Sequence, residues 1–136
     1  FNKPLIGRLI RLLGNVSMRR EDDRSAAESI IKGIKLYKQG AIVSIFPEGT
    51  RSRAEAIGPF KAGAFKLAMK PKADILVATL QNGSNVFKGW PFKRLTVRLH
   101  FHPLLTYNEY EVMNTKALSE QVRTMIEQTL DRLEKE

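Results

Sequence analysis

Apolar and polar positions alternate along this chain with two spacings, one helical and one typical of strands. Residues 25–40 and 115–134 carry apolar side chains every three or four positions, which predicts two amphipathic helices. Residues 41–46 and 75–80 are almost continuously apolar, as strands covered on both faces are. Residues 95–101 alternate strictly, which predicts a half-exposed strand near a sheet edge.

Three shorter segments complete the pattern. The spacing predicts a basic amphipathic helix over 4–13, a short strand over 15–20 and a helix over 60–70. Strands that alternate with helices are joined by crossover connections, so we expect an α/β fold with a mostly parallel sheet flanked by helices. No repeat or linker interrupts the chain, and residues 1–136 are therefore expected to form a single domain.

Local signals mark the ends of one predicted helix. Ser25 and Glu28 have capping-box spacing at its start, and Gly40 follows its end, where glycine is favoured. The basic helix over 4–13 has two interpretations, which the sequence leaves open. Either its apolar side contacts a membrane surface, or the helix packs on the domain and its arginines lie in solvent.

Net charge sets this chain apart from an ordinary globular composition. The 136 residues contain 23 basic and 14 acidic side chains, a formal charge of +9. The excess lies in residues 1–110, because residues 111–136 contain four basic and six acidic side chains. A basic body favours an anionic partner: nucleic acid, a phospholipid surface or a phosphorylated small substrate.

Two kinds of feature are absent from the sequence. The chain has no cysteine, which excludes disulfides and thiolate metal sites. No apolar run approaches the length of a bilayer span, about 18–20 residues. No signal peptide is visible either.

The loop after the first predicted buried strand, residues 46–52 (FPEGTRS), is where we expect chemistry. Loops at the carboxyl ends of strands in α/β sheets usually bind ligands. Gly49 lets a ligand approach the backbone, Thr50 offers a hydroxyl, and Arg51 suits a phosphate or carboxylate bound by two hydrogen bonds. Glu48 would orient Arg51 or bind a substrate hydroxyl. The other interpretation is an ordinary polar turn with a surface ion pair.

Further cations are predicted near the same edge of the sheet. Arg20 ends the strand over 15–20, while Lys61 and Lys66 lie on the helix just past the loop. If the two strands are neighbours, Arg20, Arg51 and Lys61 converge on one phosphate, which makes the set a candidate site.

Three segments carry a resemblance to the glycerolipid acyltransferase family. Residues 46–52 resemble the family's third motif. Residues 14–20 (GNVSMRR) are similar to its second motif, in which a glycine opens a strand that ends in arginine. Residues 59–64 (PFKAGA) look like the Phe-Lys-x-Gly segment after the third motif. Order and spacing agree from about Leu12 to Leu80, roughly half of the chain.

The resemblance implies a substrate site and a reaction. By it, the glycerol-phosphate part of the acceptor is bound by Arg20, Glu48, Gly49, Thr50, Arg51 and Lys61. The implied reaction transfers a fatty acyl group from acyl carrier protein or coenzyme A to the free hydroxyl of 1-acylglycerol-3-phosphate (lysophosphatidate), giving phosphatidate. No cofactor or metal is implied, since the acyl thioester is itself a substrate. The implied location is the cytoplasmic face of an anionic membrane, peripheral or anchored by a segment outside this chain.

Two departures from the family pattern matter. Residues 74–80 keep the strand of the fourth motif but lack its prolines, so no residue role is carried over there. The family's first motif, His-x-x-x-x-Asp, supplies the general base and the carboxylate that orients it. The only histidines are His100 and His102, and the residues five positions later are Leu105 and Tyr107, so neither forms the motif.

We therefore expect an N-terminally truncated fragment, the C-terminal portion of an acyltransferase domain, which holds the acceptor and is inactive alone. The first residue, Phe1, agrees with a fragment. His100 is predicted to be a surface histidine, and His102 to be part of a loop.

The alternative class is a non-catalytic basic module that binds anionic lipid or nucleic acid. Nucleic-acid binders interleave exposed aromatic and basic residues. Here Tyr37, Phe46, Phe60 and Phe65 fall at positions that look buried, which argues against nucleic acid.

Overall fold

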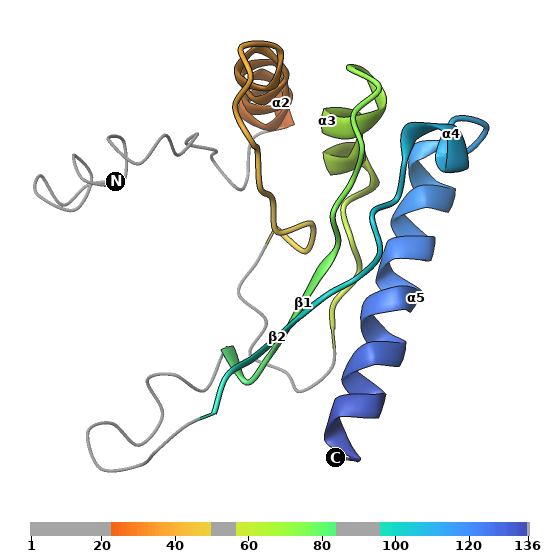
Figure 1. The fold of residues 1–136 in the computed structure, drawn as a ribbon. Coiled ribbons are helices and arrows are strands. Elements are labelled where there is room, and N and C mark those ends of the chain that lie inside the picture. Colours follow the sequence, from red (N-terminus) through yellow and green to blue (C-terminus); the bar gives the residue numbers. More distant parts are fainter. Residues whose placement is uncertain (1–22, 50–56, 84–95, 136) are drawn as a thin grey trace, which may run out of the picture. The chain divides into compact units, whose positions relative to one another are not determined.

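The computed structural model describes residues 23–49, 57–83 and 96–135. The chain divides into two compact units, Phe1–Ile45 and Phe46–Glu136, and each is described by itself. In the described parts it combines helices with one small two-stranded sheet (Figure 1). The predicted helix over 4–13 and strand over 15–20 lie outside the described residues.

The first unit contains helix α2, Asp23–Lys38. Gly40 has a φ of +88°. Its N–H donates to the carbonyl of Tyr37 at 2.9 Å, and the next N–H, of Ala41, donates to Leu36 at 3.1 Å. This pair of bonds is a Schellman motif, so the predicted glycine end of the helix is confirmed.

The start of α2 differs from the prediction. The helix begins at Asp23, two residues before the expected cap, so Ser25 lies inside its first turn. There the Ser25 carbonyl accepts a hydrogen bond from the Ser29 hydroxyl at 2.8 Å. The predicted capping box of Ser25 and Glu28 is therefore wrong.

Residues 41–46 form no strand, which contradicts the prediction of a strand buried on both faces. The Ile42 side chain is fully exposed. Phe46 is 82% and Tyr37 38% exposed, so the prediction that these two aromatic residues are buried is wrong. A strand needs a partner for its backbone groups, and the one sheet in the described ranges pairs other segments. The prediction rested on apolar composition alone. A buried strand also needs a neighbouring strand, and the described sheet contains no strand paired with residues 41–46.

The second unit begins its helical part with a 3₁₀ turn, η1 (Ala62–Phe65), followed by α3 (Lys66–Met69). The predicted helix over 60–70 is confirmed in type and is shorter. The chain then forms β1 (Ala78–Gln81) and β2 (Arg98–Phe101). Helices α4 (Tyr107–Tyr110) and α5 (Thr115–Glu134) end the unit.

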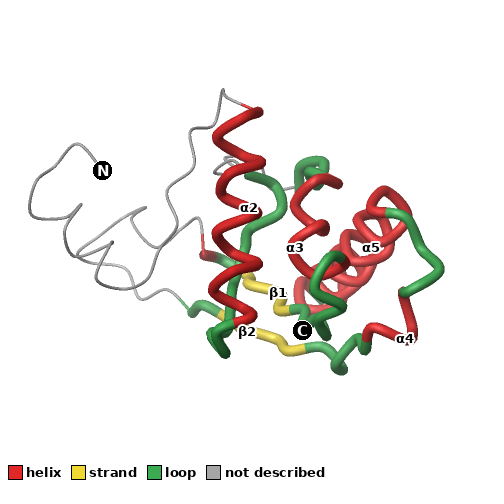
Figure 2. Tube along the Cα trace, turned by 90° about the horizontal axis from the view of Figure 1, so that it is seen from above, coloured by secondary structure: helices red, strands yellow, loops and turns green. Residues whose placement is uncertain are grey.

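The two strands pair antiparallel, with Ala78 opposite Phe101 and Leu80 opposite Leu99. Figure 2 shows β1 and β2 side by side. An isolated bridge between Ile75 and Leu105 extends the same pairing. The fold is thus a mixture of helices and sheet, but the described residues form no parallel strand pair.

Helix α5 has the bounds that the sequence predicts. Asn114 caps its start, because its side-chain oxygen accepts from the backbone N–H groups of Lys116 and Ala117 at 3.0 and 2.9 Å. One face of α5 closes the core of the unit, which consists of Phe65, Val77, Leu105, Tyr110, Leu118 and Val122. Tyr110 is fully buried and its hydroxyl donates to the carbonyl of Ala73.

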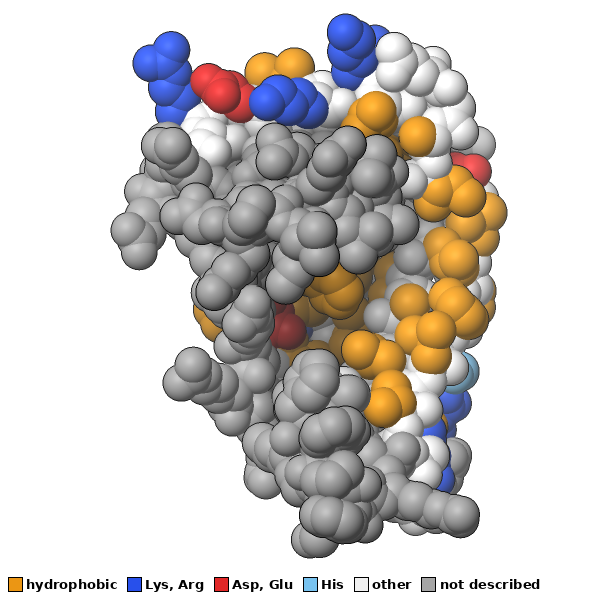
Figure 3. Space-filling model, turned by 90° about the vertical axis from the view of Figure 1, so that its left-hand side faces the viewer, with side chains coloured by type: hydrophobic (Ala, Val, Ile, Leu, Met, Phe, Trp, Pro, Cys, Tyr) orange, Lys and Arg blue, Asp and Glu red, His pale blue; other side chains and the backbone are white. Residues whose placement is uncertain are grey.

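The sheet has two unlike faces. The face packed on α5 carries the buried polar residues Thr79 and His102. The opposite face carries large apolar side chains that are 48–58% exposed: Leu76, Leu80, Leu99, Phe101 and Leu104. Figure 3 shows hydrophobic side chains gathered on the side away from α5. The predicted half-exposed strand is confirmed, but its apolar side is the exposed one.

Within the described ranges, no helix is both long enough and apolar enough to cross a membrane.

Candidate functional site

The candidate site lies where residues 46–49 meet residues 57–61. The N–H of Lys61 donates to the carbonyl of Pro47 at 2.9 Å, which ties the two segments together. The N–H of Gly49 donates to the carbonyl of Phe46 at 3.1 Å and closes a tight turn. The proline supports this turn because it has no N–H and its φ is restricted.

Gly49 gives the site its shape. Its φ of +66° lies in the left-handed region, which glycine adopts without steric cost. A Cβ atom placed on Gly49 would lie 3.0 Å from Cε and 3.1 Å from Cδ of Lys61. The Lys61 side chain therefore passes over Gly49, and a side chain at this position would make Lys61 shift by a few tenths of an ångström.

Glu48 is fixed by the other segment. Its Oε2 accepts a hydrogen bond from the backbone N–H of Gly58 at 3.3 Å. The Glu48 side chain is half-buried, so this bond holds a carboxylate beside the turn. The sequence predicted Arg51 or a substrate hydroxyl as its partner. Gly58 was missed because its spacing from Glu48 carries no signal.

Three predicted site residues, Glu48, Gly49 and Lys61, are thus brought together. The other three predicted site residues, Arg20, Thr50 and Arg51, lie outside the described residues. Lys66, which the sequence also placed near this edge of the sheet, is exposed on α3. All six proposed roles in binding remain predictions.

The described part of the site suits anion binding. The Lys61 ammonium group lies near Gly49, and the carboxylate of the preceding residue, Glu48, is held by the backbone N–H of Gly58. The ammonium group is able to bind a phosphate, and the carboxylate is able to accept a hydrogen bond from a hydroxyl. Among the residues that the structure describes, no group of three or more His, Asp or Glu side chains could hold a metal ion.

His102 lies apart from this site and is a buried residue rather than a plain loop residue. Its Nε2 is 2.8 Å from the hydroxyl of Thr79. Burial, followed by the nearby charges of His100 and Arg132, lowers the pKa of His102 below its ordinary value. His100 is half-buried on the same face, which corrects its prediction as a surface histidine. In the hydrogen bond described, the partner of His102 is a hydroxyl and not the aspartate of a catalytic dyad.

Comparison with known proteins decides the family. The chain matches the Acyltransferase family over residues 1–81, more than half of its length. The chain belongs to the acyltransferase family. The matched range contains all six predicted site residues, and the resemblance to the glycerolipid acyltransferases is confirmed.

Several curated relatives carry the name 1-acyl-sn-glycerol-3-phosphate acyltransferase. The one from Borreliella burgdorferi is 37% identical over 130 residues, which cover 91% of this chain and 52% of the relative. The one from Salmonella typhimurium is 31% identical over 134 residues, covering 98% and 55%. A chloroplastic relative from Brassica napus is 39% identical over 83 residues, covering 61% and 24%.

This acyltransferase chain spans about half the length of the two bacterial relatives. No solved structure matches it.

Proposed function

We propose that this chain forms the acceptor-binding part of a 1-acyl-sn-glycerol-3-phosphate acyltransferase. The whole protein would transfer a fatty acyl group to the free hydroxyl of lysophosphatidate and yield phosphatidate for phospholipid synthesis. The observation that carries the proposal is the position of the Lys61 side chain over Gly49, in the same turn that holds Glu48. These residues lie in the part of the chain that matches the family, and relatives named for this activity support the same substrate.

Each site residue has a proposed role. Lys61 neutralises the phosphate of the acceptor, and Gly49 keeps the path of its side chain open. Glu48 binds a hydroxyl of the glycerol. Arg20 and Arg51 bind the phosphate with paired hydrogen bonds, and Thr50 adds a hydroxyl donor.

The general base is proposed to come from outside these 136 residues. Neither histidine has an aspartate five positions later, and His102 is bonded to Thr79 in a buried position. The chain alone would therefore bind the acceptor without turnover.

The remaining features of the proposal concern partners and architecture. The acyl donor is a thioester of acyl carrier protein or coenzyme A, and no cofactor takes part. The charge of +9 supports an anionic surface at the cytoplasmic face of a membrane. We further propose a single domain in which the complete sheet is mostly parallel and flanked by helices.

The proposal is tested by removing the charge of Lys61 while keeping its length. In the full-length protein, Lys61→Met should raise the KM for lysophosphatidate about tenfold to hundredfold, the range for a hydrogen bond to a charged group. Acyl transfer from a radiolabelled donor measures it. Lys66→Met, five residues on and exposed, is the matched control and should leave the KM unchanged. Equal KM values for Lys61→Met and the parent protein would reject Lys61 as a phosphate ligand.

A second variant addresses the undescribed part of the loop. Arg51→Ala should weaken binding of lysophosphatidate to the chain, as titration calorimetry would measure.

The proposed origin of the general base has its own test. Turnover by the 136-residue chain alone, in the same radiolabel assay, would contradict a general base from outside these residues.

A further inference from the structure

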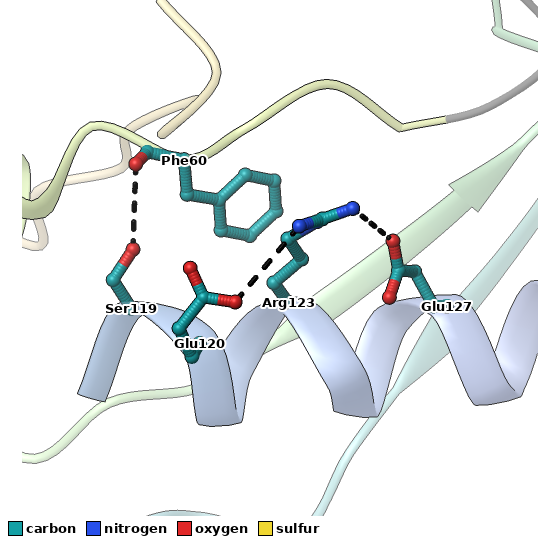
Figure 4. Close-up of polar contacts among 5 residues, drawn as sticks. All are labelled: Phe60, Ser119, Glu120, Arg123 and Glu127. Carbon is teal, nitrogen blue, oxygen red and sulfur yellow. Dashed lines mark hydrogen bonds and ion pairs between the residues drawn. The ribbon is translucent and has the colours of Figure 1, made fainter. Parts of the chain in front are cut away.

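One peptide group joins the candidate site to helix α5. The N–H of Lys61 donates to the carbonyl of Pro47 at 2.9 Å, on the site side. The carbonyl of Phe60, in the same peptide group, accepts from the Ser119 hydroxyl of α5 at 3.5 Å (Figure 4). A trans peptide group is planar and its N–H and C=O point in opposite directions. A single rigid group is therefore bonded to the loop at one end and to α5 at the other.

Ser119 is an unusual residue for its place in α5. It is 2% exposed and lies next to Leu118 in a helix whose buried face is otherwise mainly apolar. Serine is neutral to unfavourable within helices, and a buried hydroxyl is costly unless it forms a hydrogen bond. Alanine would fit the packing with less cost. The carbonyl of Phe60 gives the hydroxyl a partner.

The residues around this peptide group also hold it from the α5 side. The Phe60 ring packs against the core cluster, and α5 packs against η1, which begins directly after Lys61. One turn beyond Ser119, Arg123 pairs with Glu127 at 2.8 Å and extends toward the Phe60 ring (Figure 4). The segments before and after Lys61 are thus supported by the core and by α5.

We infer that Ser119 is a positioning residue for the acceptor site. Its hydroxyl sets the tilt of the Phe60–Lys61 peptide group, and with it the direction in which the Lys61 side chain crosses Gly49. Ser119 touches no substrate and acts through Lys61. This role rests on the proposed function, because it presumes that Lys61 binds the acceptor phosphate.

The test is Ser119→Ala in the full-length protein. We expect the KM for lysophosphatidate to rise about twofold to threefold, the lower end of the range for one neutral hydrogen bond, with kcat unchanged. The KM for the acyl donor should not change. The melting temperature should change little, because an O–H···O bond of 3.5 Å is long and weak. Ser119→Thr, which keeps the hydroxyl, should retain most of the parent KM.

A matched control separates positioning from general loss of packing. Thr129→Val removes another buried hydroxyl from the same helix, away from the site, and should leave the KM for lysophosphatidate unchanged. If Ser119→Ala and Thr129→Val give the same KM, Ser119 has no positioning role.

The double variant with Lys61→Met tests whether Ser119 acts through Lys61. If it does, Ser119→Ala adds no further rise in KM once the Lys61 charge is gone, whereas independent effects would multiply and overturn the role. If Lys61→Met alone leaves the KM unchanged, the proposed function of the site fails together with this role. If Lys61→Met raises the KM and Ser119→Ala does not, only the role of Ser119 is overturned.

Discussion

The two halves of helix α5 contact the unit in different ways. Its first half buries Leu118 and Val122 in the core and places Ser119 against Phe60, beside the candidate site. Its second half adds only the partly buried Ile126 and the buried Thr129, and its last turns meet strand β2 through polar groups. There the carbonyl of Leu133 accepts from Arg98 at 3.1 Å, and Arg132 lies 3.5 Å from the ring nitrogen of His100.

This difference shows where the helix contributes stability. Apolar burial contributes far more free energy than an exposed hydrogen bond does. The first half of α5 should therefore contribute most of the stability of the core and of the site, and the second half should contribute less. Substitutions in each half of the helix, in the candidate site and on the sheet test this difference in stability.

The largest effect is expected for Leu118→Ala. Leu118 is fully buried in the core cluster, so its truncation should lower the free energy of unfolding by about 2–5 kcal/mol. Urea denaturation measures the loss. Leu133 is half-buried in the last turn of α5. Leu133→Ala is therefore the matched control and should lower the free energy of unfolding by clearly less. Equal losses would break the division between the two halves.

Gly49→Ala should come next. A non-glycine residue in the left-handed region costs about 1–2 kcal/mol, and the added Cβ would also push against Lys61. We expect a lower melting temperature and a higher KM for lysophosphatidate. Gly63→Ala is the control, because Gly63 has open space for a Cβ and no positive φ. A tolerated Gly49→Ala would show that the path of Lys61 does not depend on this glycine.

The pH dependence tests the polar face of the sheet. The pKa of His102 is lowered in the folded chain, so the unfolded chain binds the proton more tightly. Stability should therefore fall as the pH decreases through the unfolded value of about 6.5. Melting temperatures at pH 7.5 and 5.5 measure this fall, and His102→Gln should reduce it. An identical fall in the variant would assign the effect to other groups.

The smallest effect is expected for Arg98→Ala. Its hydrogen bond to the end of α5 is exposed, so the free energy of unfolding should change by less than about 0.5 kcal/mol. A loss as large as that of Leu118→Ala would show that the second half of the helix carries the fold after all.

Local chemistry made several elements predictable. The bounds of α5, residues 115–134, follow from a sustained helical spacing of apolar residues. The glycine that ends α2, Gly40, follows from its freedom at positive φ. The same kind of local signal placed a loop at Glu48 and Gly49. The start of α2 was missed because more than one residue near Asp23 is able to begin a helix.

Pairing between distant segments was not predictable in this way. The apolar run over 41–46 indicated a buried strand, but burial depends on partners that the run itself does not specify. The alternation of residues 95–101 identified a strand correctly. The alternation predicted that the apolar face of this strand is covered. In the structure α5 packs on the opposite face, which carries His100 and His102.

For this protein, the sequence by itself determined the family and the helices α2 and α5, and it predicted the residues of the candidate site, since motifs and periodicity are properties of neighbouring positions. The tertiary structure alone decided that Lys61 crosses Gly49, that Gly58 bonds Glu48 and that Ser119 reaches Phe60 from 59 residues away. These contacts depend on how α5 packs against the unit. Packing is a property of the assembled chain, and no local pattern encodes it.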